Sequence, residues 1–299
     1  MNSNTNSINK LISNKLEIKS NNFALMIGLK PSKGARSPSL WNKFFTFNNI
    51  NAEMYPADLE NEKKLIDLLN TLKNNKSFIG AAIAAPYKKT VYEFFRDECH
   101  DDAANASFAA NNIFRNIEGV LSVANTDANA AVISIENEIF RKNSQKKAKV
   151  LILGMGATGR AIAALLKNSC ELYVWNRSKN NYVIDFLENN KNTTFLEKLP
   201  QSLDKYDLLI NATTLGSNQF EFTEDVLINQ DLVKTSKKDL VFFDINYDPP
   251  ISNHSTFFMN NGCKCINGIR MNLLQACIAI SNCYEKFTPS EVENILSKN

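Results

Sequence analysis

Apolar and polar positions alternate along the chain in a way that predicts strands and helices in turn. After a polar start, the run "FALMIGL" (23–29) predicts a strand. The run "SPSLWNKFFTF" (37–47) predicts a helix with Ser37 as its N-cap and Pro38 at its first helical position. Further strands are predicted at 52–57 and 78–85, and further helices at 59–75 and 88–97. This βαβα order is typical of an α/β fold.

The second half of the chain repeats this alternation after a change of pattern. Residues 109–127 predict a hairpin that turns at Glu118–Gly119, and residues 128–143 predict a helix near which we place a domain boundary. A buried strand (148–153), a glycine-rich turn (154–159), a helix (160–168) and another strand (171–175) follow. Later strands are predicted at 206–212 and 239–246, and closing helices at 271–287 and 289–299. Residues 1–20 are polar and low in complexity, so we expect a frayed tail.

Composition narrows the class of protein. The 299 residues are 44% hydrophobic and 22% charged, which suits two domains of ordinary size. The net charge is only +3 and the basic residues are scattered, so no nucleic-acid partner is implied. Glycines and an arginine interrupt the longest apolar stretch and no apolar signal core is present, so we expect a cytoplasmic protein that does not enter a membrane.

Cysteine and histidine usage argues against disulfides and metals. The six cysteines show no repeated CxxC, so reduced thiols are expected, and Cys263 with Cys265 is interpreted as part of a buried strand. His100 and His254 are the chain's two histidines, which makes a histidine-based metal cluster or triad hard to assemble. We therefore predict no metal site.

The clearest chemical motif is the GxGxxG of Gly154, Gly156 and Gly159. Such glycines permit a tight turn, close approach of the backbone to a pyrophosphate, and close packing of helix on strand. The following helix N-terminus favours the phosphate charge. Glycines at a βα turn can also be mere turn chemistry, but the flanking strand and helix are both predicted here, which favours dinucleotide binding.

The end of the next strand, "WNRSK", bears on the choice of cofactor. An NAD-binding fold usually offers Asp or Glu there to the ribose 2′-hydroxyl, whereas this chain has Arg177. A guanidinium can pair with a 2′-phosphate, with Asn176, Ser178 and Lys179 as further donors, so NADP is favoured over NAD. The alternative is that Arg177 is an ordinary solvated residue after a strand.

Eight short motifs occur in the order found in the shikimate dehydrogenase family, which the chain resembles over nearly its whole length after the tail. The family's Pro-Phe-Lys, Ala-Val-Asn-Thr and Asn-Thr-Asp correspond to "PYKK", "AANN" and "NTD". Its Gly-rich loop, Asn-Arg-Thr and Asn-Ala-Thr-Ser-x-Gly correspond to "GMGATGRA", "NRS" and "NATTLG". Its Asp-x-x-Tyr-x-Pro and Gly-x-x-Met-Leu-x-x-Gln-Ala correspond to "DINYDP" and "GIRMNLLQA".

The resemblance implies a fold, a cofactor and a set of site residues. It implies an N-terminal αβ substrate-binding domain (21–125, completed by helices 271–299), a Rossmann-type NADP-binding domain (126–270) and a central cleft. The catalytic pair that it implies is Lys88 and Asp127. The substrate contacts that it implies are Ser37, Asn111, Asp127, Tyr247 and Gln275. The cofactor contacts that it implies are Gly154, Gly156, Ala157, Thr158, Gly159, Asn176, Arg177, Ser178, Thr213, Ile245 and Gly268.

The chemistry itself calls for such a catalytic pair. Hydride transfer to a ketone leaves an alkoxide that must gain a proton, and a Lys–Asp pair on a hydroxyl can supply and hold it. On the pattern alone, Lys88 and Lys89 could equally be the solvated first turn of a helix, and we expect that of Lys89. Likewise Asp127 could be a helix N-cap and Asn111 a hairpin residue.

Several positions depart from the family's pattern. Ala35 replaces its first Ser, Ala82 and Ala84 replace its Asn-x-Thr, and Trp41 replaces its His. Each lost buried polar contact is worth about 0.5–3 kcal/mol, so the loss of two or three together is expected to weaken shikimate binding by orders of magnitude. Arg36 could replace the lost carboxylate contact or point to solvent.

Two hypotheses of different class follow. The first is an NADP-dependent dehydrogenase that interconverts 3-dehydroshikimate and shikimate, or acts on a related cyclic polyol acid such as quinate. The second is a catalytically weak NADP-binding protein with a sensing or partner-binding role. The expected partner is a small molecule, and a homodimer is possible.

Overall fold

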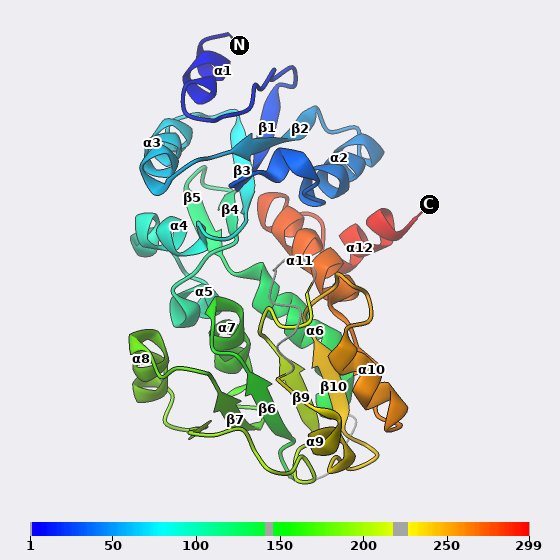
Figure 1. Cartoon of the computed structure of the whole chain (residues 1–299). Coiled ribbons are helices and arrows are strands. Elements are labelled where there is room, and N and C mark those ends of the chain that lie inside the picture. Colours follow the sequence, from blue (N-terminus) through cyan, green and yellow to red (C-terminus); the bar gives the residue numbers. More distant parts are fainter. Residues whose placement is uncertain (1, 141–145, 218–226, 299) are drawn as a thin grey trace. The chain divides into compact units, whose positions relative to one another are not determined.

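The computed structural model describes residues 2–140, 146–217 and 227–298, which form two compact units (Figure 1). Unit 1 comprises Met1–Thr126 and Leu273–Asn299, and unit 2 comprises Asp127–Asn272. Unit 1 is therefore built from both ends of the chain, and unit 2 is one continuous stretch.

Unit 1 is an α/β layer structure around a mixed sheet. Its strands are β1 (Asn22–Gly28), β2 (Ala52–Asp58), β3 (Phe78–Ile83), β4 (Asn112–Arg115) and β5 (Leu121–Ala124). They are ordered β2-β1-β3-β4-β5, with β1 parallel to β2 and β3, and with the hairpin β4–β5 antiparallel. Gly119, with φ of 80°, lies in the hairpin turn, which confirms the predicted turn position.

Helices cover both faces of this sheet. They are α1 (Asn2–Asn9), η1 (Pro31–Lys33), α2 (Ser37–Phe47), α3 (Glu62–Lys73), α4 (Lys88–Phe94), η2 (Arg96–Glu98), α5 (Asp102–Ser107), part of α11 (Gly268–Cys283) and α12 (Pro289–Ser297). Side chains of β1 alternate between the faces: Phe23 packs in the core with α3 and α4, and Ala24 packs in the core with α2, α11 and α12. The period of two thus sorts the strand's side chains into two cores.

The N-terminal segment is folded, which contradicts the expected frayed tail. Ile8, Ile12 and Leu16 are each at most 6% exposed and belong to the α3–α4 core. Asn14 lies along the edge strand β2, where its side chain donates to Pro56 O and accepts from the Asp58 N–H, each at 2.8 Å. The segment stays folded against unit 1, although most of its residues are polar, because these apolar contacts and edge hydrogen bonds stabilise it.

Unit 2 has the strand order of a dinucleotide-binding Rossmann fold. Its strands are β6 (Lys149–Leu153), β7 (Glu171–Trp175), β8 (Thr193–Leu196), β9 (Leu208–Asn211), β10 (Val241–Asp244) and β11 (Lys264–Ile266), all parallel. The sheet order is β11-β10-β9-β6-β7-β8, so the order reverses between β6 and β9. Its helices are α6 (Thr126–Phe140), α7 (Ala157–Leu166), α8 (Asn181–Asn189), α9 (Gln230–Lys234) and α10 (Asn253–Asn260).

A few local predictions need correction. Helix α2 begins one residue earlier than expected, so Arg36 is the N-cap and Ser37 lies within the first turn. Helix α7 begins at Ala157, inside the predicted glycine turn. The expected strand around the CxC is the short β11, with Cys263 buried just before it and Cys265 half-buried. The last part of the helix predicted at 128–143 lies outside the described residues.

Candidate functional site

The glycine-rich loop joins β6 to α7 at the carboxyl edge of the unit 2 sheet. Gly154 has φ of 94°, a backbone conformation that favours glycine. A Cβ atom on Gly159 would lie 1.9 Å from Gly154 O, because the first turn of α7 packs directly on the backbone of Gly154. A Cβ on Gly156 would meet no atom within 4 Å in the part of the chain that the structure describes. The chain therefore needs Gly159 for its own packing and leaves open space at Gly156, as a pyrophosphate approaching the backbone requires.

The end of β7 carries the residues expected to choose between NAD and NADP. Asn176 is engaged by its own chain: its Oδ1 accepts from the Met155 N–H (2.9 Å) and its Nδ2 donates to Ser178 O (2.7 Å). It thereby ties the end of β7 to the glycine loop. Arg177 and Ser178 are exposed, and the ammonium of Lys179 lies 3.3 Å from Glu197.

The loops that follow β9 and β10 hold the remaining cofactor candidates of unit 2. Thr213 is half-buried, and its hydroxyl donates to Asn211 Oδ1 at 2.6 Å. Asn211 in turn donates to Asp244 Oδ1 at 3.1 Å, which links the ends of the two strands. Ile245 and Gly268 pack directly together, because a Cβ on Gly268 would lie 1.9 Å from Ile245 O. The carboxyl edge is thus a connected hydrogen-bonded layer.

Lys88 and Lys89 occupy the first turn of α4 in unit 1 but differ in surroundings. Lys89 is exposed and its ammonium lies 3.4 Å from the Glu93 carboxylate one turn later, as expected of a solvated residue. Lys88 is half-buried, and its carbonyl accepts the Ala110 N–H at 2.9 Å. That bond joins the start of α4 to the segment that carries Asn111.

Asn111 anchors the residue that precedes Asp127. Its Oδ1 accepts the Thr126 N–H at 2.7 Å, and its Nδ2 lies 3.0 Å from Thr126 Oγ1. Asn111 and Thr126 are 4% and 0% exposed, so these bonds are shielded from water. Asp127 is half-buried as the second residue of α6, inside the helix and not its N-cap. Asn111, a predicted substrate residue, therefore also holds the first residue of α6 in place.

The other substrate candidates are distributed over both units. Ser37 is buried in the first turn of α2, and Gln275 is half-buried on α11; both belong to unit 1. Tyr247 is half-buried after β10 in unit 2, the unit that also contains Asp127. Lys88, Ser37, Asn111 and Gln275 thus share one unit.

The departures from the family pattern are partly explained by packing. Trp41 is fully buried in the same apolar cluster as Ala82, and its Nε1 has no hydrogen-bond partner within the described ranges. The large Trp41 and the small Ala82 thus belong to one apolar cluster, whereas the family has polar residues at both positions. Ala84 is half-buried, 3.1 Å from where a Cβ on Gly28 would lie, and Arg36 is exposed.

Two buried ionisable groups lie near the carboxyl edge of unit 2. Burial raises the pKa of the Asp244 carboxyl, although hydrogen bonds from Ser252, Asn246 and Asn211 oppose the shift. Burial lowers the pKa of His254, and neither of its ring nitrogens has a hydrogen-bond partner among the described residues. His254 is thus held neutral by desolvation.

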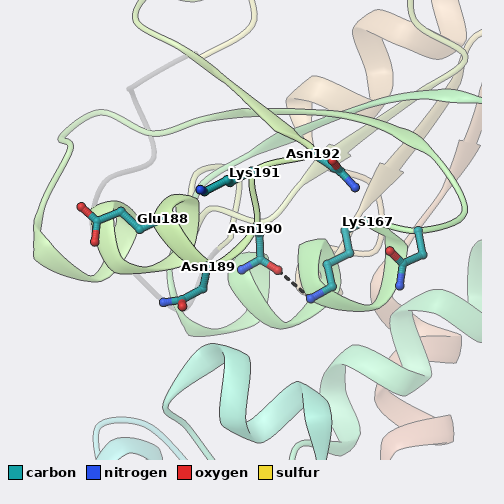
Figure 2. Close-up of a pocket in the computed structure, with 7 residues that line it drawn as sticks. Lys167, Glu188, Asn189, Asn190, Lys191 and Asn192 are labelled. Atoms are coloured by element: carbon teal, nitrogen blue, oxygen red, sulfur yellow. Dashed lines mark hydrogen bonds between the residues drawn. The ribbon is translucent and has the colours of Figure 1, made fainter.

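A polar surface pocket lies elsewhere in unit 2, between the last turns of α7 and α8 (Figure 2). Residues 188–192 line it together with Lys167 and Asn168, and Lys167 Nζ donates to Asn190 Oδ1 at 2.7 Å. It adjoins helix C-termini, whose carbonyls disfavour anions, and not the strand ends where such folds bind nucleotides. We do not assign it to the candidate site.

Metal and membrane functions gain no support from the described residues. Within them, no group of three or more His, Cys, Asp or Glu side chains could hold a metal ion. None of the described helices combines the length and the apolar character that a membrane span requires.

The fold and the glycine loop define a two-domain α/β protein with a Rossmann-type nucleotide domain. Two family models match it: "Shikimate / quinate 5-dehydrogenase" over residues 135–262, and "Shikimate dehydrogenase substrate binding domain" over residues 27–113. The NADP(+)-type shikimate dehydrogenase of Pyrococcus furiosus is 30% identical over 254 residues, 82% of this chain and 84% of the relative. The chain belongs to the shikimate dehydrogenase family.

Solved structures show the same fold. Shikimate dehydrogenase from Aquifex aeolicus aligns with a TM-score of 0.76 at 22% identity, over 95% of this chain and 100% of that one. A ligand-free 5-ketofructose reductase of Gluconobacter aligns with a TM-score of 0.70 at 19% identity, over 94% and 99% of the two chains. The fold is therefore shared by enzymes named for different substrates.

Proposed function

We propose that the chain is an NADP-dependent oxidoreductase that reversibly reduces 3-dehydroshikimate to shikimate. The observation that carries this proposal is the glycine loop, with open space at Gly156, on a chain of the shikimate dehydrogenase family. Relatives named as NADP(+)-type shikimate dehydrogenases support both cofactor and substrate.

The cofactor would be held by unit 2. The helix N-terminus of α7 and the open Gly156 would receive the pyrophosphate. The exposed Arg177 and Ser178 would contact the 2′-phosphate, because no acid stands at the end of β7 to accept a ribose 2′-hydroxyl. Thr213, Ile245 and Gly268 would lie along the nicotinamide half. When bound, NADPH supplies a hydride to the substrate carbon.

The proton would be handled by Lys88 and Asp127. In the reduction, the Lys88 ammonium gives a proton to the oxygen that gains negative charge, and in the oxidation the neutral amine takes it back. The Asp127 carboxylate would accept a hydrogen bond from a substrate hydroxyl. Asn111 would hold the start of α6 through Thr126 and contact a substrate hydroxyl. Ser37, Tyr247 and Gln275 would complete the substrate contacts.

A matched lysine pair tests the catalytic role. Shikimate or quinate is added with NADP, and NADPH formation is followed by absorbance. Lys88→Ala should abolish turnover, whereas Lys89→Ala should retain it, because Lys89 is exposed and paired with Glu93. Absence of turnover with either acid, or full activity of Lys88→Ala, would refute the proposal.

A second candidate function follows from the loss of polar groups at Ala35, Ala82 and Ala84. The site would then accept another cyclic polyol acid such as quinate, or would bind NADPH as a weakly catalytic sensor. A protein of the same fold is named as a 5-ketofructose reductase, which supports this second candidate. Calorimetry separates these cases, since NADPH binding without binding of any shikimate-type acid favours the sensor.

Localisation and assembly stay predictions. All six cysteines are unpaired, which accords with the reducing conditions of the cytoplasm. Fractionation of cells and sedimentation of the purified protein test the cytoplasmic location and the homodimer.

A further inference from the structure

Asn246 joins the loops at the carboxyl edge of unit 2 through its backbone N–H, its backbone carbonyl and its side-chain nitrogen Nδ2. Its N–H donates to Asp244 Oδ1 (3.1 Å), and its carbonyl accepts the N–H of Gly268 (2.9 Å). Its Nδ2 lies within hydrogen-bond distance of Thr213 O and Leu215 O (3.2 Å each) and of Asp244 Oδ1 (2.9 Å). One residue therefore connects the loop after β9, the loop after β10 and the start of α11.

These two loops and the start of α11 carry the cofactor candidates Thr213, Ile245 and Gly268. Gly268 also packs so closely on Ile245 O that no Cβ fits between them. Asp244, which accepts the side chain and the backbone N–H of Asn246, is 1% exposed and further held by Ser252 Oγ at 2.6 Å. The buried Asp244 carboxylate thus anchors the Asn246 side chain, whose Nδ2 also reaches the carbonyls of Thr213 and Leu215.

The place of these loops along the sheet determines which end of a dinucleotide they meet. The glycine loop after β6 receives the pyrophosphate, and the end of β7 on one side meets the adenosine ribose. β9 lies on the other side of β6, with β10 beyond it. The loops joined by Asn246 therefore face the nicotinamide half of a cofactor laid across the point where the strand order reverses.

We propose that Asn246 is a positioning residue that aligns these loops for the nicotinamide half of NADP(H). This inference rests on the proposed function and deepens it. The family's Asp-x-x-Tyr-x-Pro motif leaves this position unspecified, so the role comes from the hydrogen bonds of this chain. Asn246 acts through the loop backbones and not through contact with the reacting atoms.

Binding of the whole cofactor and of its adenosine fragment gives the test. Calorimetry is performed with NADPH and with adenosine 2′,5′-bisphosphate on wild type and on Asn246→Leu, because leucine keeps the branched shape of asparagine and has no donor. The Kd for NADPH should rise about tenfold as the loop carbonyls lose their shared donor. The Kd for the fragment should stay within about twofold, because the β7 side is unchanged.

The matched control is Asn261→Leu in the same unit. Asn261 is half-buried like Asn246, and its Nδ2 donates to Val233 O (3.1 Å) and Ser236 Oγ (3.0 Å), groups that precede the start of β10. The Asn261→Leu variant removes similar bonds at the opposite edge of the sheet. The Kd values for NADPH and for the adenosine fragment should therefore both stay unchanged. Asn246→Ala, which adds no bulk, replaces Asn246→Leu if the latter does not fold.

The outcomes separate this inference from the proposed function. Equal weakening of both ligands in the Asn246 variants would show a general structural role and overturn the inference. Wild-type affinity for NADPH in these variants would also overturn it, while leaving the proposed function intact. If the wild-type chain binds neither ligand, the proposed function falls and the inference falls with it.

Discussion

Substituting Gly156 by alanine should separate the needs of the ligand from the needs of the fold. Gly156 has φ of −65° and ψ of −171°, an extended conformation that alanine adopts without strain. The added Cβ would meet no atom of the described residues within 4 Å. Alanine is a poorer N-cap than glycine but loses less entropy on folding. Because the two effects oppose each other, the free energy of unfolding should change by less than about 1 kcal/mol.

The effect on NADPH binding should be much larger, because the methyl group enters the space that the pyrophosphate needs. NADPH at one hundred times its Kd stabilises the wild type by about 2.7 kcal/mol. A tenfold rise in Kd leaves about 1.4 kcal/mol of that stabilisation, and a hundredfold rise about 0.4 kcal/mol. Thermal unfolding with and without NADPH reads both quantities from one sample.

Gly262→Ala provides the reverse case in the same unit. Gly262 also has open space around its Cβ position, but its φ of 80° makes alanine unfavourable by about 1–2 kcal/mol. This variant should lose stability and keep its NADPH affinity. If Gly156→Ala binds NADPH as tightly as the wild type, the pyrophosphate does not lie on this loop and the reasoning is wrong.

Three further predictions concern buried groups. Burial lowers the pKa of His254 from 6.5, so the unfolded chain takes up this proton first and stability is lost as the pH falls below 6.5. His254→Leu should therefore lose less stability than wild type between about pH 7.5 and about pH 5.5 in urea unfolding, and equal losses would contradict this. Asn111→Leu should lower the free energy of unfolding by about 1–3 kcal/mol, measured in urea, because the buried Thr126 N–H loses its acceptor; an unchanged value would show that this bond is dispensable. Ile8→Ala should cost about 2–5 kcal/mol in thermal unfolding, whereas Asn6→Ala, at an exposed position, should cost little; equal effects would show that the segment does not stabilise unit 1.

Much of the fold could be predicted from periodicity and turn residues. The unbroken apolar run of β6 and the glycines after it predict a strand, a tight turn and a helix because buried parallel strands have that pattern. The N-terminal segment was missed because its composition was weighed above its spacing. Ile8, Ile12 and Leu16 recur every four residues within the polar stretch, a regular spacing that indicates buried positions, although α1 ends at Asn9 and contains only Ile8 of the three. No such signal predicts the pairing of Asn14 with edge strand β2, which depends on tertiary structure.

The candidate site was less accessible to sequence reasoning. Motifs located the glycine loop, Lys88 and Asn111, yet they gave Asn176 only as a donor to the cofactor, whereas its side chain fastens the loop to β7. The hydrogen bonds that Asn246 and Asp244 make to the loop after β9 were not predicted, because they join segments far apart in the chain. Hydrogen-bond partners across loops follow from strand order, and strand order is not encoded in local pattern.

The composition of unit 1 from both chain ends has a consequence for biosynthesis. Unit 2 is complete once residue 272 has left the ribosome, whereas the core around Trp41 still lacks Ile280 of α11 and Val292 of α12. The domain that begins first is therefore the last to be finished, and its apolar sheet face stays open while a later domain is made. A ribosome that stops shortly before the end would release a chain with an intact nucleotide domain and an unfinished substrate domain.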